Sequence, residues 1–197
     1  MIISAANLIK QSMKQMVYFH FNKSKPQPSQ RMIDGTAYQD KFNFDHKERR
    51  GIYTVNDINI FFSIDGIHGD IAYEIKHIDH NLQWLVNMSI IQTSFYHSLL
   101  HKVSSLDTPK FMTDKEHPYY IMDLNSNKIN YYLLVTKDSK YAVEPSKQVF
   151  YHYVYKALLL NKIINGDYDH YDEAAKWDNL FKHKEHYLLK HINYKPI

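Results

Sequence analysis

Residues 58–76, INIFFSIDGIHGDIAYEIK, carry the clearest structural pattern in the chain. Apolar residues alternate with other residues from 58 to 65, and a second alternating run covers 71–78, which predicts two strands joined by a tight turn. The first strand is expected to end at Asp65, and Glu74 and Lys76 share one face of the second. A carboxylate and an ammonium buried in an apolar strand cost several kcal/mol unless they are paired or bind a metal, so their presence needs a reason.

The charged pair has an ordinary explanation and a functional one. In the ordinary one, Glu74 and Lys76 occupy the solvent side of a half-buried strand. In the functional one, Asp65 and Glu74 at the ends of adjacent strands hold a divalent cation, and Lys76 positions or deprotonates the attacking water. The second arrangement is the core of metal-dependent phosphodiester hydrolysis.

The acidic and basic residues of this stretch resemble a known motif. Asp65, followed by Glu74–Lys76, is similar to the PD-(D/E)XK nuclease motif. The segment Ser63–Gly66 resembles the Ser-Pro-Asp-Gly segment of the lambda-exonuclease branch, with isoleucine in place of proline. Acid-x-Lys also occurs at Asp45–Lys47 and Asp138–Lys140, but only the tripeptide at 74–76 lies in an apolar strand behind another acid-ended strand.

Two further segments resemble the same superfamily. Gln92–Tyr96, on a predicted helix, is similar to the Gln-xxx-Tyr motif of RecB-like exonucleases and is the only Gln-x3-Tyr in the chain. Met32–Gln39 resembles a helix in which a glycine, here Gly35, is followed four residues later by a His or Glu that assists the metal site. That position is Gln39, whose amide oxygen can bind a cation but adds no charge. The resemblance therefore does not decide whether the chain has a second metal site.

The resemblance implies an α/β fold with a restriction-endonuclease-like core. A mixed central β-sheet of about five strands, flanked by α-helices, would form a single nuclease domain over 1–197. The implied activity is that of a Mg²⁺-dependent deoxyribonuclease, most simply an exonuclease in DNA recombination, repair or phage replication.

Each matched residue has an implied role. Lys76 would orient or activate the water, while Gln92 and Tyr96 would position Lys76 or the DNA backbone. The residues assigned to catalysis are Asp65, Glu74, Lys76, Gln92 and Tyr96. The Mg²⁺ or Mn²⁺ ligands would be Asp65, Glu74 and the main-chain carbonyl of Ile75, with Gln39 as a further candidate.

Several alternatives stay open. Asp57 could be the first metal acid, although it lies at the far end of an eight-residue strand, roughly 25 Å from Asp65. The chain could also be a nuclease-fold DNA- or protein-binding protein that cleaves nothing, or a restriction-type endonuclease that leaves discrete fragments. By analogy with lambda-type relatives, a homo-oligomer and a single-strand annealing partner are also conceivable.

Composition narrows the class of protein. With 197 residues, 44% hydrophobic and 23% charged, the chain has the balance of one globular domain. It contains no cysteine, which excludes disulfides and a cysteine-ligated iron–sulfur cluster. The net charge is only +3, so attraction to DNA must come from local groups such as Lys23, Lys25 and Arg31. The apolar run Ile2–Phe21 is too broken for a membrane span, and we expect a cytoplasmic protein without a membrane partner.

The remaining segments carry ordinary element signals. We expect helices at Ile2–Phe21, Gly35–Phe44 with Asp34 as N-cap, Asn81–Leu106, 146–164 and 171–192. Further strands are expected at Gly51–Val55, Tyr119–Leu124 and Lys128–Thr136, the last two joined as a hairpin by Asn125–Asn127. Histidines 183, 186 and 191 lack an accompanying Cys or His-Glu-x-x-His, so zinc is not favoured there.

Overall fold

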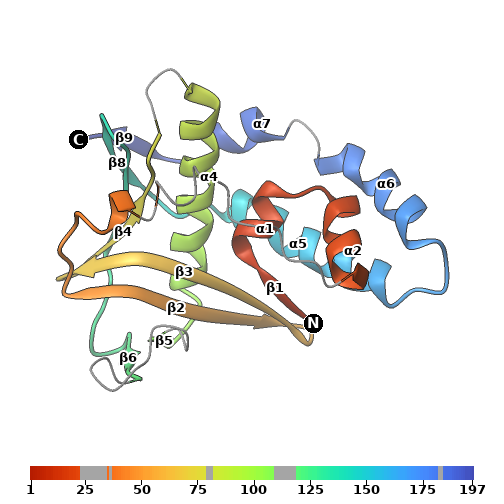
Figure 1. Cartoon of the computed structure of the whole chain (residues 1–197), viewed down its shortest axis with the longest axis horizontal. Coiled ribbons are helices and arrows are strands. Elements are labelled where there is room, and N and C mark those ends of the chain that lie inside the picture. Colours follow the sequence, from red (N-terminus) through yellow and green to blue (C-terminus); the bar gives the residue numbers. More distant parts are fainter. Residues whose placement is uncertain (23–34, 36, 79–81, 109–118, 182–183) are drawn as a thin grey trace.

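A computed structural model describes residues 1–22, 35, 37–78, 82–108, 119–181 and 184–197. Within these ranges the chain is α/β, with a mixed, open, mostly antiparallel sheet flanked by helices (Figure 1). The strands are β1 (Ile2–Ser4), β2 (His46–Val55), β3 (Ile58–His68), β4 (Ile71–Ile75), β5 (Ser105–Asp107), β6 (Ile121–Asp123), β7 (Tyr131–Val135), β8 (Lys140–Val143) and β9 (Tyr194–Pro196). The helices are α1 (Ala5–Lys10), α2 (Met13–Asn22), α4 (Gln83–Leu100), α5 (Lys147–Ile164), α6 (His170–Phe181) and α7 (Glu185–Leu189).

The sheet is wider than the expected five strands. Across the described residues it has nine strands in the order β6-β5-β2-β3-β4-β7-β8-β9, with β1 pairing alongside β3. Among the strand pairs of that part of the chain, only β1–β3 and β4–β7 are parallel. The strands that the sequence did not predict are β1, β5, β8 and β9. They have only three or four residues each, which is too short for an alternating pattern to show in the sequence.

The pair β3–β4 forms as predicted, with one change at its end. Alternate β3 residues from Ile58 to Ile64 are buried, and a turn at Gly69 with φ +57° leads into β4. The strand does not end at Asp65, because the hairpin continues through the pairs Ile67–Ala72 and His68–Ile71. Asp65 therefore lies inside β3, close to the point where β4 ends.

Helix α4 is the central helix of the fold and crosses the sheet (Figure 1). It packs against β2, β3, β7 and β8, and every side chain from 89 to 100 is buried. The predicted apolar stripe is correct for Ile91, Phe95 and Leu99, whereas Trp84 is 60% exposed. The predicted end at Leu106 is wrong, because the helix ends at Leu100 and Leu106 is the buried residue of β5.

The single N-terminal helix expected from the sequence is also wrong. The segment contains β1, which pairs with β3, and then two helices separated at Gln11 and Ser12. Two distant side chains hold the break. Lys156 of α5 donates to the main-chain oxygens of Leu8 and Gln11, both at 2.7 Å, and Asp178 of α6 accepts from the main-chain nitrogen of Met13 at 2.5 Å.

The predicted β6–β7 hairpin does not form, because β6 pairs with β5 and β7 pairs with β4 and β8. Asp123 accepts hydrogen bonds from the main-chain nitrogen of Asn125 and the hydroxyl of Ser126, and this turn directs the chain away from β6.

The helix predictions near the two ends of the chain have mixed outcomes. Helix α5 is confirmed, and its N-cap Ser146 accepts from the main-chain nitrogen of Val149. The second C-terminal helix is interrupted, since α6 ends at Phe181 and α7 begins at Glu185. The helix expected over 35–44 ends in a turn at 40–41, and its expected cap Asp34 lies outside the described residues, as do Lys23, Lys25 and Arg31.

The described helices include none with the length and apolar character that crossing a membrane would require.

Candidate active site

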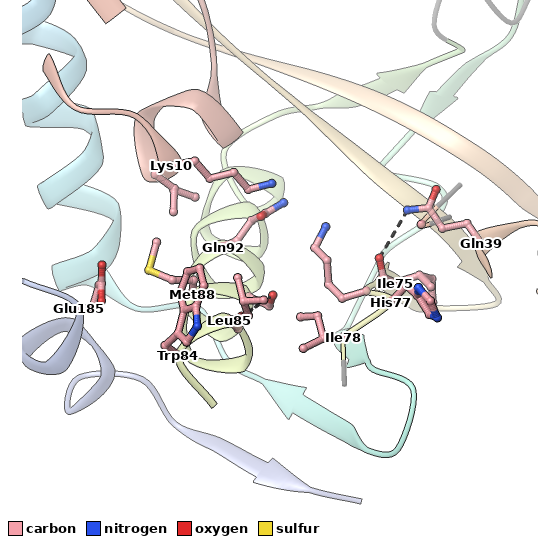
Figure 2. Close-up of a pocket in the computed structure, with 14 residues that line it drawn as sticks. Lys10, Gln39, Ile75, His77, Ile78, Trp84, Leu85, Met88, Gln92 and Glu185 are labelled. Atoms are coloured by element: carbon pink, nitrogen blue, oxygen red, sulfur yellow. Dashed lines mark hydrogen bonds between the residues drawn. The ribbon is translucent and has the colours of Figure 1, made fainter. Parts of the chain in front are cut away.

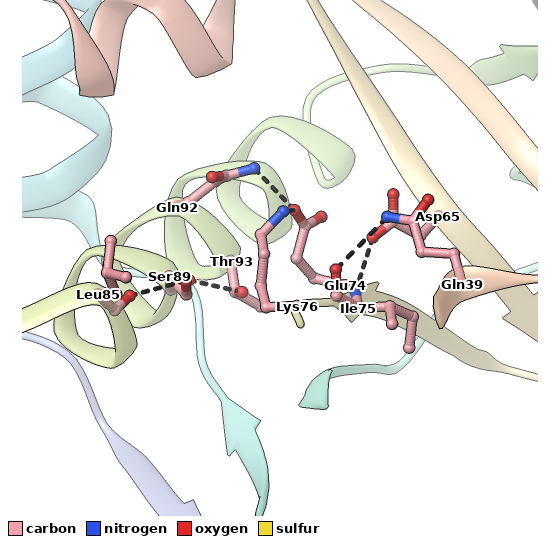
Figure 3. A network of polar contacts seen from close by, with 9 residues as sticks. All are labelled: Gln39, Asp65, Glu74, Ile75, Lys76, Leu85, Ser89, Gln92 and Thr93. Atoms are coloured by element: carbon pink, nitrogen blue, oxygen red, sulfur yellow. Dashed lines mark hydrogen bonds and ion pairs between the residues drawn. The ribbon is translucent and has the colours of Figure 1, made fainter. Parts of the chain in front are cut away.

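Glu74 is the buried centre of a polar cluster between β4 and α4. Its side chain is 1% exposed, and its Oε1 accepts hydrogen bonds from Gln92 Nε2 at 2.7 Å and from Lys76 Nζ (Figure 3). The other carboxylate oxygen, Oε2, is buried without a hydrogen bond of good geometry among the described residues, and the buried hydroxyl of Tyr132 on β7, which interacts with the Glu74 side chain, also lacks one. A buried carboxylate oxygen without a good hydrogen bond is costly, so Glu74 is held in a geometry that leaves one strong acceptor available.

Asp65 lies next to this cluster on the neighbouring strand. Its Oδ2 accepts from the main-chain nitrogen of Ile75 at 2.6 Å (Figure 3). Burial, and then the negative charge of Glu74, raise the pKa of Asp65 to about 7, although Lys76 acts in the opposite direction. The negative charge of Glu74 thus adds to the cost of ionising Asp65, and a cation bound beside Asp65 would offset that cost.

Lys76 follows β4 directly and pairs with Glu74. Burial lowers the pKa of its ammonium, but the negative charges of Glu74 and Asp65 outweigh burial, so the pKa is raised. In this arrangement Lys76 is a protonated donor that holds Glu74 in position.

The two α4 residues of the predicted motif differ in what they can contact. Gln92 reaches Glu74 directly, whereas Tyr96 is 4% exposed and its ring packs 5.8 Å from the ring of Phe62. Burial, and then the charges of Glu74 and Asp65, raise the pKa of Tyr96 well above its usual value. Tyr96 is therefore buried behind Gln92, and its hydroxyl interacts with the Gln92 side chain.

Gln39 reaches the site from the helical residues 37–39. Its Nε2 donates to the main-chain oxygen of Ile75 over 3.4 Å (Figure 3). This oxygen is the carbonyl that the sequence motif predicts as a metal ligand. The structure thus brings the amide group of Gln39 to the main-chain oxygen of Ile75.

The residues around Glu74 fit a hard divalent cation. Asp65, Glu74 and the carbonyl of Ile75 offer oxygen donors, which Mg²⁺ and Mn²⁺ prefer, and Oε2 of Glu74, which lacks a good hydrogen bond, is the clearest available ligand. The described residues include no cluster of three or more His, Cys, Asp or Glu side chains that could hold a metal. A cation here would therefore have few protein ligands and would keep several waters, as Mg²⁺ usually does.

Two other candidates do not reach the site. Asp57 lies in the turn between β2 and β3, with φ 61°, and its main-chain oxygen accepts from the amino group of Met1 at 2.9 Å. This turn is at the opposite end of β3 from Asp65. Of the three C-terminal histidines, His183 lies outside the described residues, His186 is in α7, and His191 follows that helix.

A cavity of about 680 Å³ opens beside the cluster (Figure 2). Lys76, Gln92 and Gln39 line it, together with Lys10 at the end of α1. Burial, and then the positive charge of Lys76, lower the pKa of Lys10, while Glu74 and Asp65 raise it less. Sequence reasoning missed Lys10, because its place at the cavity depends on the break between α1 and α2, for which the sequence has no local signal.

This sequence matches no family model, and neither the curated proteins nor the solved structures include a significant match to it.

Proposed function

We propose that the chain is a metal-dependent nuclease that hydrolyses phosphodiester bonds in DNA. The observation that carries this proposal is the buried carboxylate of Glu74, which is held by Lys76 and Gln92 on one oxygen, has a buried second oxygen without a good hydrogen bond, and adjoins Asp65 on the next strand. If Glu74 and Lys76 formed only a structural ion pair, there would be no reason for a second acid, Asp65, to lie beside the buried Glu74 with its pKa raised to about 7.

The chain's own residues have distinct parts in this proposal. Asp65, Glu74 and the main-chain oxygen of Ile75 would hold Mg²⁺ or Mn²⁺. When bound, such an ion supplies Lewis-acid stabilisation of the phosphate charge and lowers the pKa of a coordinated water. Gln92 fixes the orientation of the Glu74 carboxylate. Lys76 supplies a positive charge and hydrogen-bond donors at the place where charge develops on the phosphate.

The test is digestion of end-labelled linear DNA and of closed circular DNA, with Mg²⁺ or Mn²⁺ and then with excess chelator. We expect metal-dependent cleavage that falls on the order of a hundredfold or more in Asp65→Asn and in Glu74→Gln. Asp57→Asn is the matched control and should cleave at the parental rate, because it lies at the other end of β3. Progressive loss from linear ends supports an exonuclease, whereas discrete fragments or cleavage of the circle support an endonuclease. Absence of cleavage with either metal, or full activity in Glu74→Gln, would overturn the proposal.

A second candidate function has its own supporting observation. The hydrogen-bond donor of Gln39, rather than a carboxylate, approaches the carbonyl of Ile75 and competes with a cation for that oxygen. A chain with this arrangement could keep the sheet and bind DNA or a protein without cleaving. The digestion assay, run beside a filter-binding measurement, separates the two functions. A non-cleaving protein leaves the length of the labelled DNA unchanged in Mg²⁺, and it retains this DNA on a filter if DNA is its ligand. A homo-oligomer or an annealing partner has only the motif resemblance behind it.

A further inference from the structure

The cavity beside the candidate active site has two chemically different sides. Lys10 of α1 and Lys76 after β4 contribute positive charge, while Trp84, Leu85 and Met88 of α4 contribute an apolar wall (Figure 2). Of the described residues that line the cavity, Glu185 is the one acid. The ligand that suits this lining has a flat apolar part and an anionic part.

Trp84 is the most informative member of the apolar wall. It lies in the first turn of α4, one residue after its start, and is 60% exposed although the helix from 89 onward is fully buried. A large exposed indole at the mouth of a cavity presents a flat face that the fold does not use. Aromatic faces of this kind stack on nucleobases with little regard to base identity.

Lys10 is the complementary member on the charged side. Lys156 of α5 fixes the end of α1 by donating to the main-chain oxygens of Leu8, two residues before Lys10, and of Gln11, which follows Lys10. This anchoring directs α1 so that Lys10 is at the cavity rather than on a free end. An ammonium on an anchored helix end is suited to bind a phosphate group as a point charge.

From these two sides we propose that the cavity binds an unpaired nucleotide of a single DNA strand next to the bond to be cleaved. Trp84 stacks on the base, and Lys10 binds a backbone phosphate. The inference rests on the proposed nuclease function for its reason, and it adds that the preferred substrate is single-stranded DNA or a frayed end. The volume of about 680 Å³ lies in the usual range of small-ligand sites and is far too small for a duplex.

An apolar helix of a partner protein is a weaker fit to the same surface. Such a helix needs a continuous hydrophobic groove, and here the groove is interrupted by Lys10, Lys76 and Gln92. The positive charge instead favours a ligand with phosphates.

The test measures binding without catalysis, in excess chelator, by the fluorescence of Trp84. The chain has two tryptophans, so Trp177→Phe leaves Trp84 as the only one. We expect an oligothymidine of about ten nucleotides to quench this fluorescence. Lys10→Met in the same background should weaken binding, and the slope of the logarithm of the binding constant against the logarithm of the salt concentration should become smaller by about one unit. The matched control is Trp84→Phe, which retains Trp177 and should show no quenching. If Trp177→Phe does not fold, the difference between the parental protein and Trp84→Phe provides the same signal.

A second measurement uses a labelled oligonucleotide and does not depend on tryptophan emission. Trp84→Ala should weaken its binding about tenfold or more, and a blunt duplex of equal length should bind less tightly than the single strand. Cleavage of DNA without quenching of Trp84 would overturn the cavity inference and leave the nuclease proposal standing. Quenching without metal-dependent cleavage would support a nucleotide-binding cavity and overturn the nuclease proposal. Equal binding of single strand and duplex would also overturn the inference.

Discussion

Replacing Lys156 by methionine should remove a measurable rise of stability with pH. The side chain is 4% exposed and donates to the main-chain oxygens of Leu8 and Gln11, and its ammonium lies 5.5 Å from the ring centre of Phe181. Burial lowers the pKa of Lys156 from 10.5 to about 8, against the opposing charge of Asp178.

The sign and size of the effect follow from these two pKa values. Because the pKa of Lys156 is lower in the folded state, the unfolded chain binds more protons between pH 8 and 10.5, and stability rises with pH in that window. From about pH 7 to about pH 9.5 this group alone should raise the free energy of unfolding by about 2 kcal/mol. The rise should be absent for a methionine, which does not titrate.

The assay is urea unfolding of the parental protein and of Lys156→Met at several pH values in this range. Lys10 also has a lowered pKa and contributes a rise of the same sign, but both proteins share it, so the difference between them isolates Lys156. The range stops below the usual pKa of tyrosine, because buried tyrosines such as Tyr153, whose pKa is raised, destabilise the fold at higher pH. An equal rise in the two proteins would refute the assignment of a lowered pKa to Lys156.

Two further predictions concern the candidate active site. Lys76→Arg and Lys76→Ala should each lower the single-turnover cleavage rate on the order of a hundredfold or more, with little change in DNA binding. Arginine should fail as well as alanine because a guanidinium spreads its donors too widely to replace the ammonium at Glu74. Parental activity in the arginine variant would exclude a catalytic lysine. Gln39→Glu replaces an amide by a carboxylate at the carbonyl of Ile75 and should lower the Mg²⁺ concentration that gives half-maximal cleavage. If the Mg²⁺ titration is unchanged, residues 37–39 have no role in the site.

The sequence predicts well those parts of the fold that depend on local patterns. The alternation in β3 predicts the buried set from Ile58 to Ile64, and the helix of the Gln-xxx-Tyr motif lies where its pattern places it. Glu74, Lys76 and Gln92 also come together as expected. These successes have one cause, because each depends on side-chain periods within a single strand or helix or on a short hairpin.

The failures share the opposite cause. The break between α1 and α2 is held by Lys156 and Asp178, which lie far along the chain, while helical periodicity continues across residues 11 and 12. The predicted β6–β7 hairpin is wrong because proximity in sequence does not determine the strand partners here, and β6 pairs with β5. Lys10 was missed for the same reason, since its position at the cavity follows from that non-local break.

The continuous burial of α4 has a consequence for hydrogen exchange. Amide protons in a helix whose side chains are all buried from 89 to 100 should exchange with solvent only when the whole domain unfolds, so this segment should be the slowest-exchanging part of the chain. Gln92 and Tyr96 would then belong to the most cooperative unit of the fold. Any rearrangement that accompanies binding of a cation or a DNA strand must therefore occur outside residues 89–100. We expect changes in protection on binding at the ends of β3 and β4, at residues 37–39 and in the first turn of α4, where Trp84 lies, while residues 89–100 stay unchanged.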